Sequence, residues 1–168
     1  SAMRIKPADR SIFGTLHMVK PARTRRPPAK QILRDFLGQQ LVESPWVRRL
    51  GRISFLGTLD YHPKSKAAPS RLEHSLAVAA LGYHVSANFP LTPTERRTFV
   101  AACLLHDIGH FPLSHAAEPG FARALGVGHH GVSEWIVRGN GSIPGAHSLR
   151  PVLESNGLDP DLVWGIIT

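Results

Sequence analysis

The sequence predicts an all-α fold, and three observations support this class. From residue 31 onward, apolar residues recur mostly at helical spacing, and the alternation that is typical of strands is scarce. Two capping boxes, which begin at Ser70 and Thr92, each precede an apolar run. Proline and glycine interrupt the helical pattern at short intervals. We therefore expect a helical bundle with short connections.

The first strong helix signal lies at Ser44, a good N-cap residue, which is followed by Pro45 at the first helical position. Val47, Leu50 and Ile53 then recur at core spacing. Residues 57–69 contain glycine, proline and lysine and are predicted to form a loop.

Two longer helices follow this loop. The helix that begins at Ser70 runs through His74 as far as Val85. In the helix that begins at Thr92, Phe99, Cys103 and His106 lie one turn apart, and we expect it to end near Gly109 because a proline follows at position 112.

The last part of the chain contains two further helix signals. Residues 133–138 are predicted to lie in a short helix that Asn140 and Gly141 break. Asp159 and Pro160 begin a final helix that runs to Thr168.

The chain has 168 residues, which is the size of one domain, but its charge is uneven. Residues 1–34 carry nine Lys or Arg and one acid, whereas residues 35–168 carry eleven of each sign. We expect a basic, partly disordered arm over 1–34 and a helical core over 35–168, with Ser1 and Ala2 typical of residues left by tag cleavage. The arm is either a solvated leader or a segment that binds nucleic acid through its positive charge.

The composition also indicates the cellular compartment of the protein. No apolar run approaches the ~18–20 residues that a membrane span needs, and the N-terminus lacks the apolar region of a signal peptide. Cys103 is the only cysteine and cannot form an internal disulfide, which suits a reducing compartment. We expect a cytoplasmic protein without a membrane partner.

The stretch LLHDIGHFPLSH, residues 104–115, concentrates histidines and an aspartate at the end of an apolar run. His106 and Asp107 are neighbours about 100° apart around a helix, so both side chains can bind one cation. Imidazole and carboxylate together suit Mn, Fe, Co, Ni or Zn. His74, in the first turn of the preceding helix, is the candidate third ligand. The alternative is that these histidines are hydrogen-bonded core residues, but a carboxylate buried without a partner would be costly.

Three segments resemble the HD-domain phosphohydrolases: Arg71-Leu-Glu-His74-Ser, then the stretch from Leu105 to His115, then His129-His-Gly-Val-Ser133. Within that superfamily they are most similar to the deoxynucleotide triphosphohydrolase branch, whose pattern is R-F-E-H-S, H-D-x-G-H-x-P-F-S-H and H-E-x-x-S. The resemblance covers about residues 40–138. It implies an HD-domain-like helical bundle.

The resemblance also implies roles for seven residues. The metal ligands are His74, His106 and Asp107, and Arg71 contacts a substrate phosphate. The residues that line the catalytic pocket, one of which donates a proton to the leaving oxygen, are His110, His115 and His129. The implied activity is hydrolysis of a nucleotide phosphate ester or triphosphate by metal-activated water, with Mg on the substrate phosphates and assembly into a homo-oligomer as further expectations.

The sequence departs from the family pattern at two points. The family takes a fourth metal ligand from an aspartate on a later helix, whereas the late carboxylates here are Glu154, Asp159 and Asp161, and Asp159 is better explained as an N-cap. An acidic residue usually stands where His130 does. We expect either a chain that lacks its last helices or a short, divergent member of the family.

Two other functions compete with the enzyme. A degenerate, non-catalytic HD module would bind nucleotide or nucleic acid, and its binding would survive chelation of metal. A purely structural bundle would leave the set of histidines unexplained.

Overall fold

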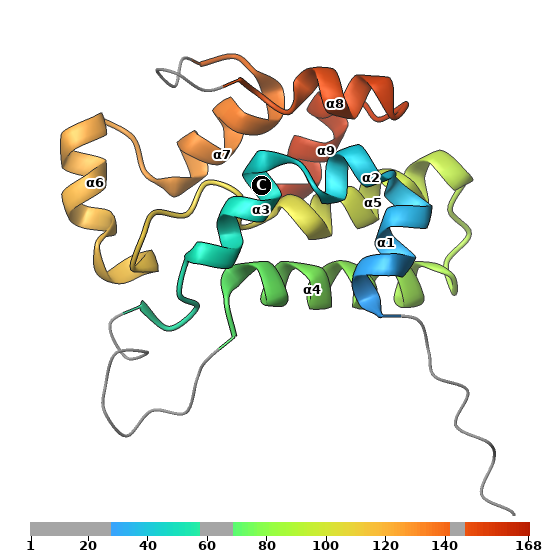
Figure 1. Ribbon diagram of the computed structural model, residues 1–168. Helices are drawn as coiled ribbons and strands as arrows, with labels where there is room; N and C mark the ends of the chain where they lie inside the picture. The colour runs from blue at the N-terminus through green and yellow to red at the C-terminus, as the bar shows by residue number, and fades with distance from the viewer. Residues whose placement is uncertain (1–27, 58–68, 142–146) are drawn as a thin grey trace, which may run out of the picture.

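The computed structural model describes residues 28–57, 69–141 and 147–168. Within these ranges the regular structure is helical and contains no strand, apart from an isolated antiparallel bridge between Ser54 and Ser70. Figure 1 shows the helices packed around one another in a single bundle. The all-α prediction is confirmed. The predicted loop at 57–69 and the arm before residue 28 fall almost entirely outside the described residues.

The described chain begins with three short helices: α1 (Ala29–Leu37), α2 (Gln39–Val42) and α3 (Pro45–Arg49), the last followed by a 3-10 turn at Leu50–Arg52. The predicted cap of α3 is present, because the Ser44 side chain accepts a hydrogen bond from the backbone N–H of Val47. The boundary expected after residue 34 lies inside α1. Leu33 on this helix is fully buried, so residues 29–34 of the expected arm belong to a helix that packs against the core.

The two long helices α4 (Arg71–Ser86) and α5 (Pro93–Leu105) begin with the predicted capping boxes. They pack closely, because the buried face of α4 carries small residues such as Ala79 and Gly82. A methyl group on Gly82 would lie 2.9 Å from the Cys103 sulfur on α5. Helix α5 ends four residues before the expected Gly109, and the chain then enters a turn.

The second half contains α6 (Glu118–Leu125), α7 (His129–Arg138), α8 (Arg150–Ser155) and α9 (Pro160–Ile167), with a short 3-10 turn at Ser114–Ala116 before α6. Helix α7 includes the predicted segment 133–138 but starts at His129. The predicted N-cap of α9 is confirmed, because Asp159 accepts hydrogen bonds from the backbone of Asp161 and Leu162. Helix α6 was not predicted.

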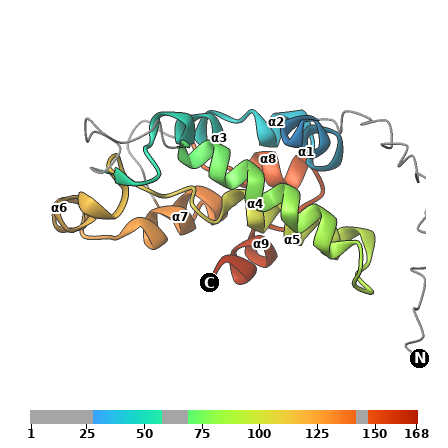
Figure 2. The ribbon, with the colours of Figure 1, turned by 90° about the horizontal axis from the view of Figure 1, so that it is seen from below.

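Helix α5 is the centre of the bundle and packs against both α4 and α9. Seen from below, α4 lies across α5, and α9 lies at the lower edge of the bundle beside the C-terminus (Figure 2). Leu104 and Leu105 at its end and Ile108 just beyond it are fully buried. The turn that follows α5 is therefore anchored by the core. Among the residues that the structure describes, none of the helices combines the length and the apolar character needed to cross a bilayer.

Candidate active site

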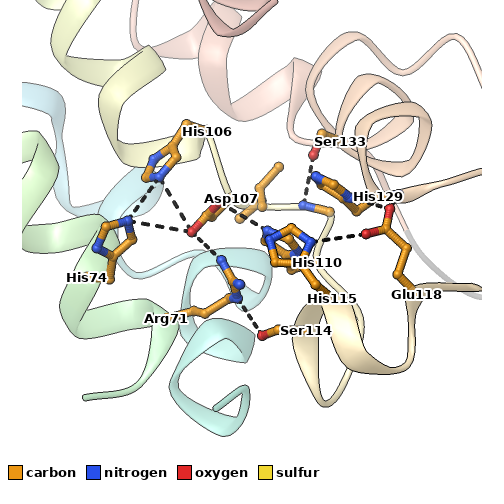
Figure 3. Close-up of polar contacts among 12 residues, drawn as sticks. Arg71, His74, His106, Asp107, His110, Ser114, His115, Glu118, His129 and Ser133 are labelled. Atoms are coloured by element: carbon orange, nitrogen blue, oxygen red, sulfur yellow. Dashed lines mark hydrogen bonds and ion pairs between the residues drawn. The ribbon is translucent and has the colours of Figure 1, made fainter. Parts of the chain in front are cut away.

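The turn after α5 lies between the start of α4 and the start of α7, and it carries three of the seven candidate residues (Figure 3). His106 closes α5, and the chain turns through Asp107 to His110. Arg49 of α3 stabilises this turn, because its Nη2 donates to the backbone carbonyls of Ile108 at 2.8 Å and His110 at 2.9 Å. These carbonyls lie outside the helix and need partners. Arg49 thus explains why the chain can leave the helix before Gly109.

Gly109 allows the turn to approach α7 closely. A methyl group at this position would lie 2.2 Å from the His129 carbonyl oxygen and 2.4 Å from the Ser133 backbone nitrogen. The Gly109 N–H also donates to the Ser133 hydroxyl at 3.0 Å. The absence of a side chain at 109 therefore brings His129 next to the turn.

The first group of candidate ligands, which we call the HD cluster, consists of His74, His106 and Asp107. The two Nε2 atoms of His74 and His106 are 3.3 Å apart, and Asp107 Oδ2 lies 3.4 Å from His106 Nε2 and 3.8 Å from His74 Nε2. Ligand atoms placed about 2.1 Å from a tetrahedral metal would be about 3.4 Å from one another. The three donor atoms therefore fit a divalent transition metal.

The protonation of the two histidines also suits a metal. His106 Nδ1 lies 2.9 Å from the Cys103 carbonyl, which can only accept, so the ring donates from Nδ1 and its neutral form leaves the Nε2 lone pair free. Burial lowers the pKa of His74 below its ordinary value, although Asp107 acts in the opposite direction. The tautomer of His106 and the lowered pKa of His74 therefore both favour metal binding through Nε2.

Asp107 is buried, with 8% of its surface exposed, and both of its carboxylate oxygens have partners. Arg71 Nη1 donates to Oδ2 at 2.6 Å, and His110 Nε2 lies 3.2 Å from Oδ1. Burial alone would raise the pKa of Asp107. The hydrogen bond from His110 and the charges of His106 and Arg71 outweigh it and hold the pKa well below its ordinary value, so the carboxylate is ionised.

Arg71, for which the resemblance implies contact with a substrate phosphate, is bound by protein groups. Its side chain is only 4% exposed, and its guanidinium binds Asp107 and, through Nε, the Ser114 hydroxyl at 2.7 Å. The ring of Phe55 lies 5.4 Å from the guanidinium carbon. Arg71 therefore holds the Asp107 carboxylate of the HD cluster from the buried side.

The remaining predicted residues, His110, His115 and His129, form a second group that we call the histidine cluster. Each offers a ring nitrogen within 4.8 Å of the others. The rings of His110 and His129 are stacked at 4.2 Å, and the ring of His115 is perpendicular to that of His110 at 4.8 Å. Asp107 joins the two clusters through His110. The structure therefore brings all seven predicted residues into one region.

Glu118 is a member of this region that the sequence analysis missed. Its carboxylate lies 3.2 Å from His115 Nδ1 and also accepts from His129 Nδ1 (Figure 3). Partial burial would raise the pKa of Glu118, but its contacts with His129 and His115 lower the pKa to about 2. Its position as the first residue of α6, three residues after His115, was the available signal.

The late carboxylates do not reach the HD cluster. Asp159 caps α9, Asp161 pairs with Arg138 at 2.6 Å, and Glu154 pairs with Arg150 at 2.9 Å. Within the described residues, the HD cluster contains no fourth histidine, cysteine or carboxylate ligand.

Comparison with known proteins identifies the class to which this arrangement belongs. The HD domain family matches residues 71–160, which is more than half of the chain and includes every residue of both clusters. The chain belongs to the HD-domain family. No curated protein matches it.

Proposed function

We propose that this protein is a metal-dependent phosphohydrolase that acts on a nucleotide phosphate ester or triphosphate. The observation that carries the proposal is the HD cluster, whose three donor atoms are spaced as ligands of one divalent metal. The side chains of His74 and His106 are 32% and 31% exposed, so a metal held there would remain accessible to substrate. Such access is needed at a catalytic metal site, where one coordination position stays open to water or substrate.

His74, His106 and Asp107 would hold the metal, with Mn, Fe, Co, Ni and Zn as the candidates that suit this donor set. When bound, such a metal lowers the pKa of water and acts as a Lewis acid towards a phosphoryl oxygen. Asp107 is suited to binding the metal because it is ionised and its orientation is fixed by Arg71 and His110. Its negative charge also balances part of the charge of the cation.

The histidine cluster would supply the proton for the leaving oxygen. His115 is the best donor of the three, because its side chain is 69% exposed and its Nδ1 lies beside the Glu118 carboxylate. A carboxylate beside Nδ1 orients the ring and leaves Nε2 as the nitrogen available to the substrate. His110 and His129 would form the wall of the pocket behind it.

The choice of a nucleotide, and of the deoxynucleotide triphosphohydrolase branch in particular, is supported by the sequence motifs around His74, His106 and His129. The competing proposal is a non-catalytic HD module that binds nucleotide. It is favoured by the lack of a fourth ligand in the HD cluster among the residues that the structure describes.

The test is to measure metal by elemental analysis after incubation with Mn, Fe, Co, Ni or Zn, followed by phosphate release from a panel of nucleotides. The variants are Asp107→Asn and, as a matched control, Asp161→Asn, whose carboxylate lies in an exposed ion pair. We expect near-stoichiometric metal and phosphate release in the wild type and the control, and neither in Asp107→Asn. Absence of metal from the wild type would refute the proposal and favour the binding module, and metal without phosphate release from any nucleotide of the panel would refute nucleotide hydrolysis.

A further inference from the structure

We propose that Ser114 is a positioning residue that fixes the metal-facing oxygen of Asp107 through Arg71. The inference rests on the proposed metal function of the HD cluster. It concerns a contact of Ser114 and Arg71 that lies behind the cluster and does not face solvent, since both residues are only 3% exposed.

The Ser114 hydroxyl has a defined orientation because it both donates one hydrogen bond and accepts another. It lies 2.6 Å from the Ser54 carbonyl, which can only accept, so the hydroxyl proton points there. A lone pair is then left for Arg71 Nε, whose N–H donates to Ser114 Oγ at 2.7 Å. The donor and acceptor of each hydrogen bond in this series, from Arg71 to Ser114 and from Ser114 to the backbone of Ser54, are therefore fixed.

Arg71 transmits this constraint to Asp107. The guanidinium is planar and rigid, so fixing Nε also fixes the direction of its other N–H groups. Nη1 donates to Asp107 Oδ2 at 2.6 Å, and this is the oxygen that lies 3.4 Å from His106 Nε2. Ser114 consequently determines where the carboxylate places the oxygen that faces the metal position.

The backbone around Ser114 is strained in a way that supports the same contact. Leu113 and Ser114 have φ angles of 63° and 53°, in the left-handed region that residues other than glycine rarely adopt. Leu113 is 37% exposed, whereas Ser114 is buried. Such outliers persist only where the surroundings impose them, and here the hydrogen bonds of Ser114 are among those constraints.

The first experiment measures the affinity of the metal-free protein for Mn²⁺ and Ni²⁺ by isothermal titration calorimetry, in the wild type and in Ser114→Ala. The control is Ser75→Ala, which removes a buried hydroxyl that has no hydrogen-bond partner among the described residues. We expect about a tenfold loss of affinity for Ser114→Ala, as is typical when an outer-shell contact of a metal ligand is removed, and none for the control. If Ser114→Ala fails to fold, Ser114→Gly removes the same hydroxyl and also relieves the left-handed strain.

A double-mutant cycle separates positioning from a general structural effect. Arg71→Lys keeps a positive charge but removes the Nε–H that Ser114 accepts. In the Arg71→Lys background, Ser114→Ala should therefore change metal affinity less than twofold. The same tenfold loss in both backgrounds, or equal affinities for Ser114→Ala and the wild type, would overturn the inference. A wild type that binds no metal would instead refute the proposed function.

Discussion

Replacing Gly109 with alanine is a sensitive test of how the turn after α5 meets α7. The added methyl group would lie 2.2 Å from the His129 carbonyl oxygen, where ordinary contact begins at 3.4 Å. The two nearest obstacles are backbone atoms, so the start of α7 must move by about 1 Å, and overpacking of this kind costs about 1–3 kcal/mol. Loss of the hydrogen bond from Gly109 to Ser133 adds about 1 kcal/mol. The lower entropy of alanine in the unfolded chain offsets about 0.4–1 kcal/mol of this.

The expected result for Gly109→Ala is therefore a free energy of unfolding lower by about 2 kcal/mol, which with a typical urea m-value moves the midpoint down by about 1 M. The matched control is Gly120→Ala in α6, where a methyl group meets no atom of the described residues within 4 Å and should stabilise the helix by about 0.5–1 kcal/mol. Urea unfolding followed by circular dichroism measures both. A Gly109→Ala protein as stable as the wild type would refute the argument that this glycine is required for the close approach.

Three further predictions concern caps, protons and metal. Ser70→Ala removes the capping box of α4 and should lower the free energy of unfolding by about 1 kcal/mol in a thermal or urea melt, whereas no change would mean that α4 does not depend on its cap. The pKa of Glu118 is lowered from 4.5 to about 2, so its ionised form stabilises the fold above pH 4.5 and this contribution is lost as the pH falls towards 2. Glu118→Gln should accordingly flatten the decline of stability over that range, and an unchanged pH profile would contradict the contacts of Glu118 with the two histidines. Metal at about one hundred times its Kd should raise the free energy of unfolding by about 2.7 kcal/mol, and an equal rise in Asp107→Asn would place the metal elsewhere.

The meeting of His74 with the His106–Asp107 pair could be predicted from sequence because it depends on local rules. The capping box at Ser70 puts His74 in the first turn of α4. Helices that follow each other in the sequence tend to pack together, and this packing brings His74 close to the end of α5. Asp159 could be recognised as a cap for the same reason, since a helix start is a local feature.

The face that α4 buries could not be predicted in this way. Its large apolar residues Leu81 and Val85 are 63% and 41% exposed, whereas small residues contact α5. Close approach of two helices favours small side chains at the contact, and this tertiary effect overrides hydrophobic patterning.

The partners of Arg71 and the role of Glu118 were also outside the reach of sequence reasoning. Both depend on the path of the chain between His110 and α6, which includes the left-handed residues Leu113 and Ser114. Nothing in the composition of this stretch favours that backbone, because neither residue is glycine or asparagine. The surrounding fold imposes it.

The hydrogen bonds of Arg49 and Ser54 determine which fragments of this protein can form the site. The family match begins at Arg71, and both clusters lie entirely after that point. Yet the carbonyls of Ile108 and His110 are bound by Arg49, and the Ser114 hydroxyl is bound by the carbonyl of Ser54. A fragment that started at α4 would keep every candidate ligand and lose the donor and the acceptor that shape the turn between them. The smallest piece able to form the site therefore begins before α3, well upstream of the motifs by which its family is recognised.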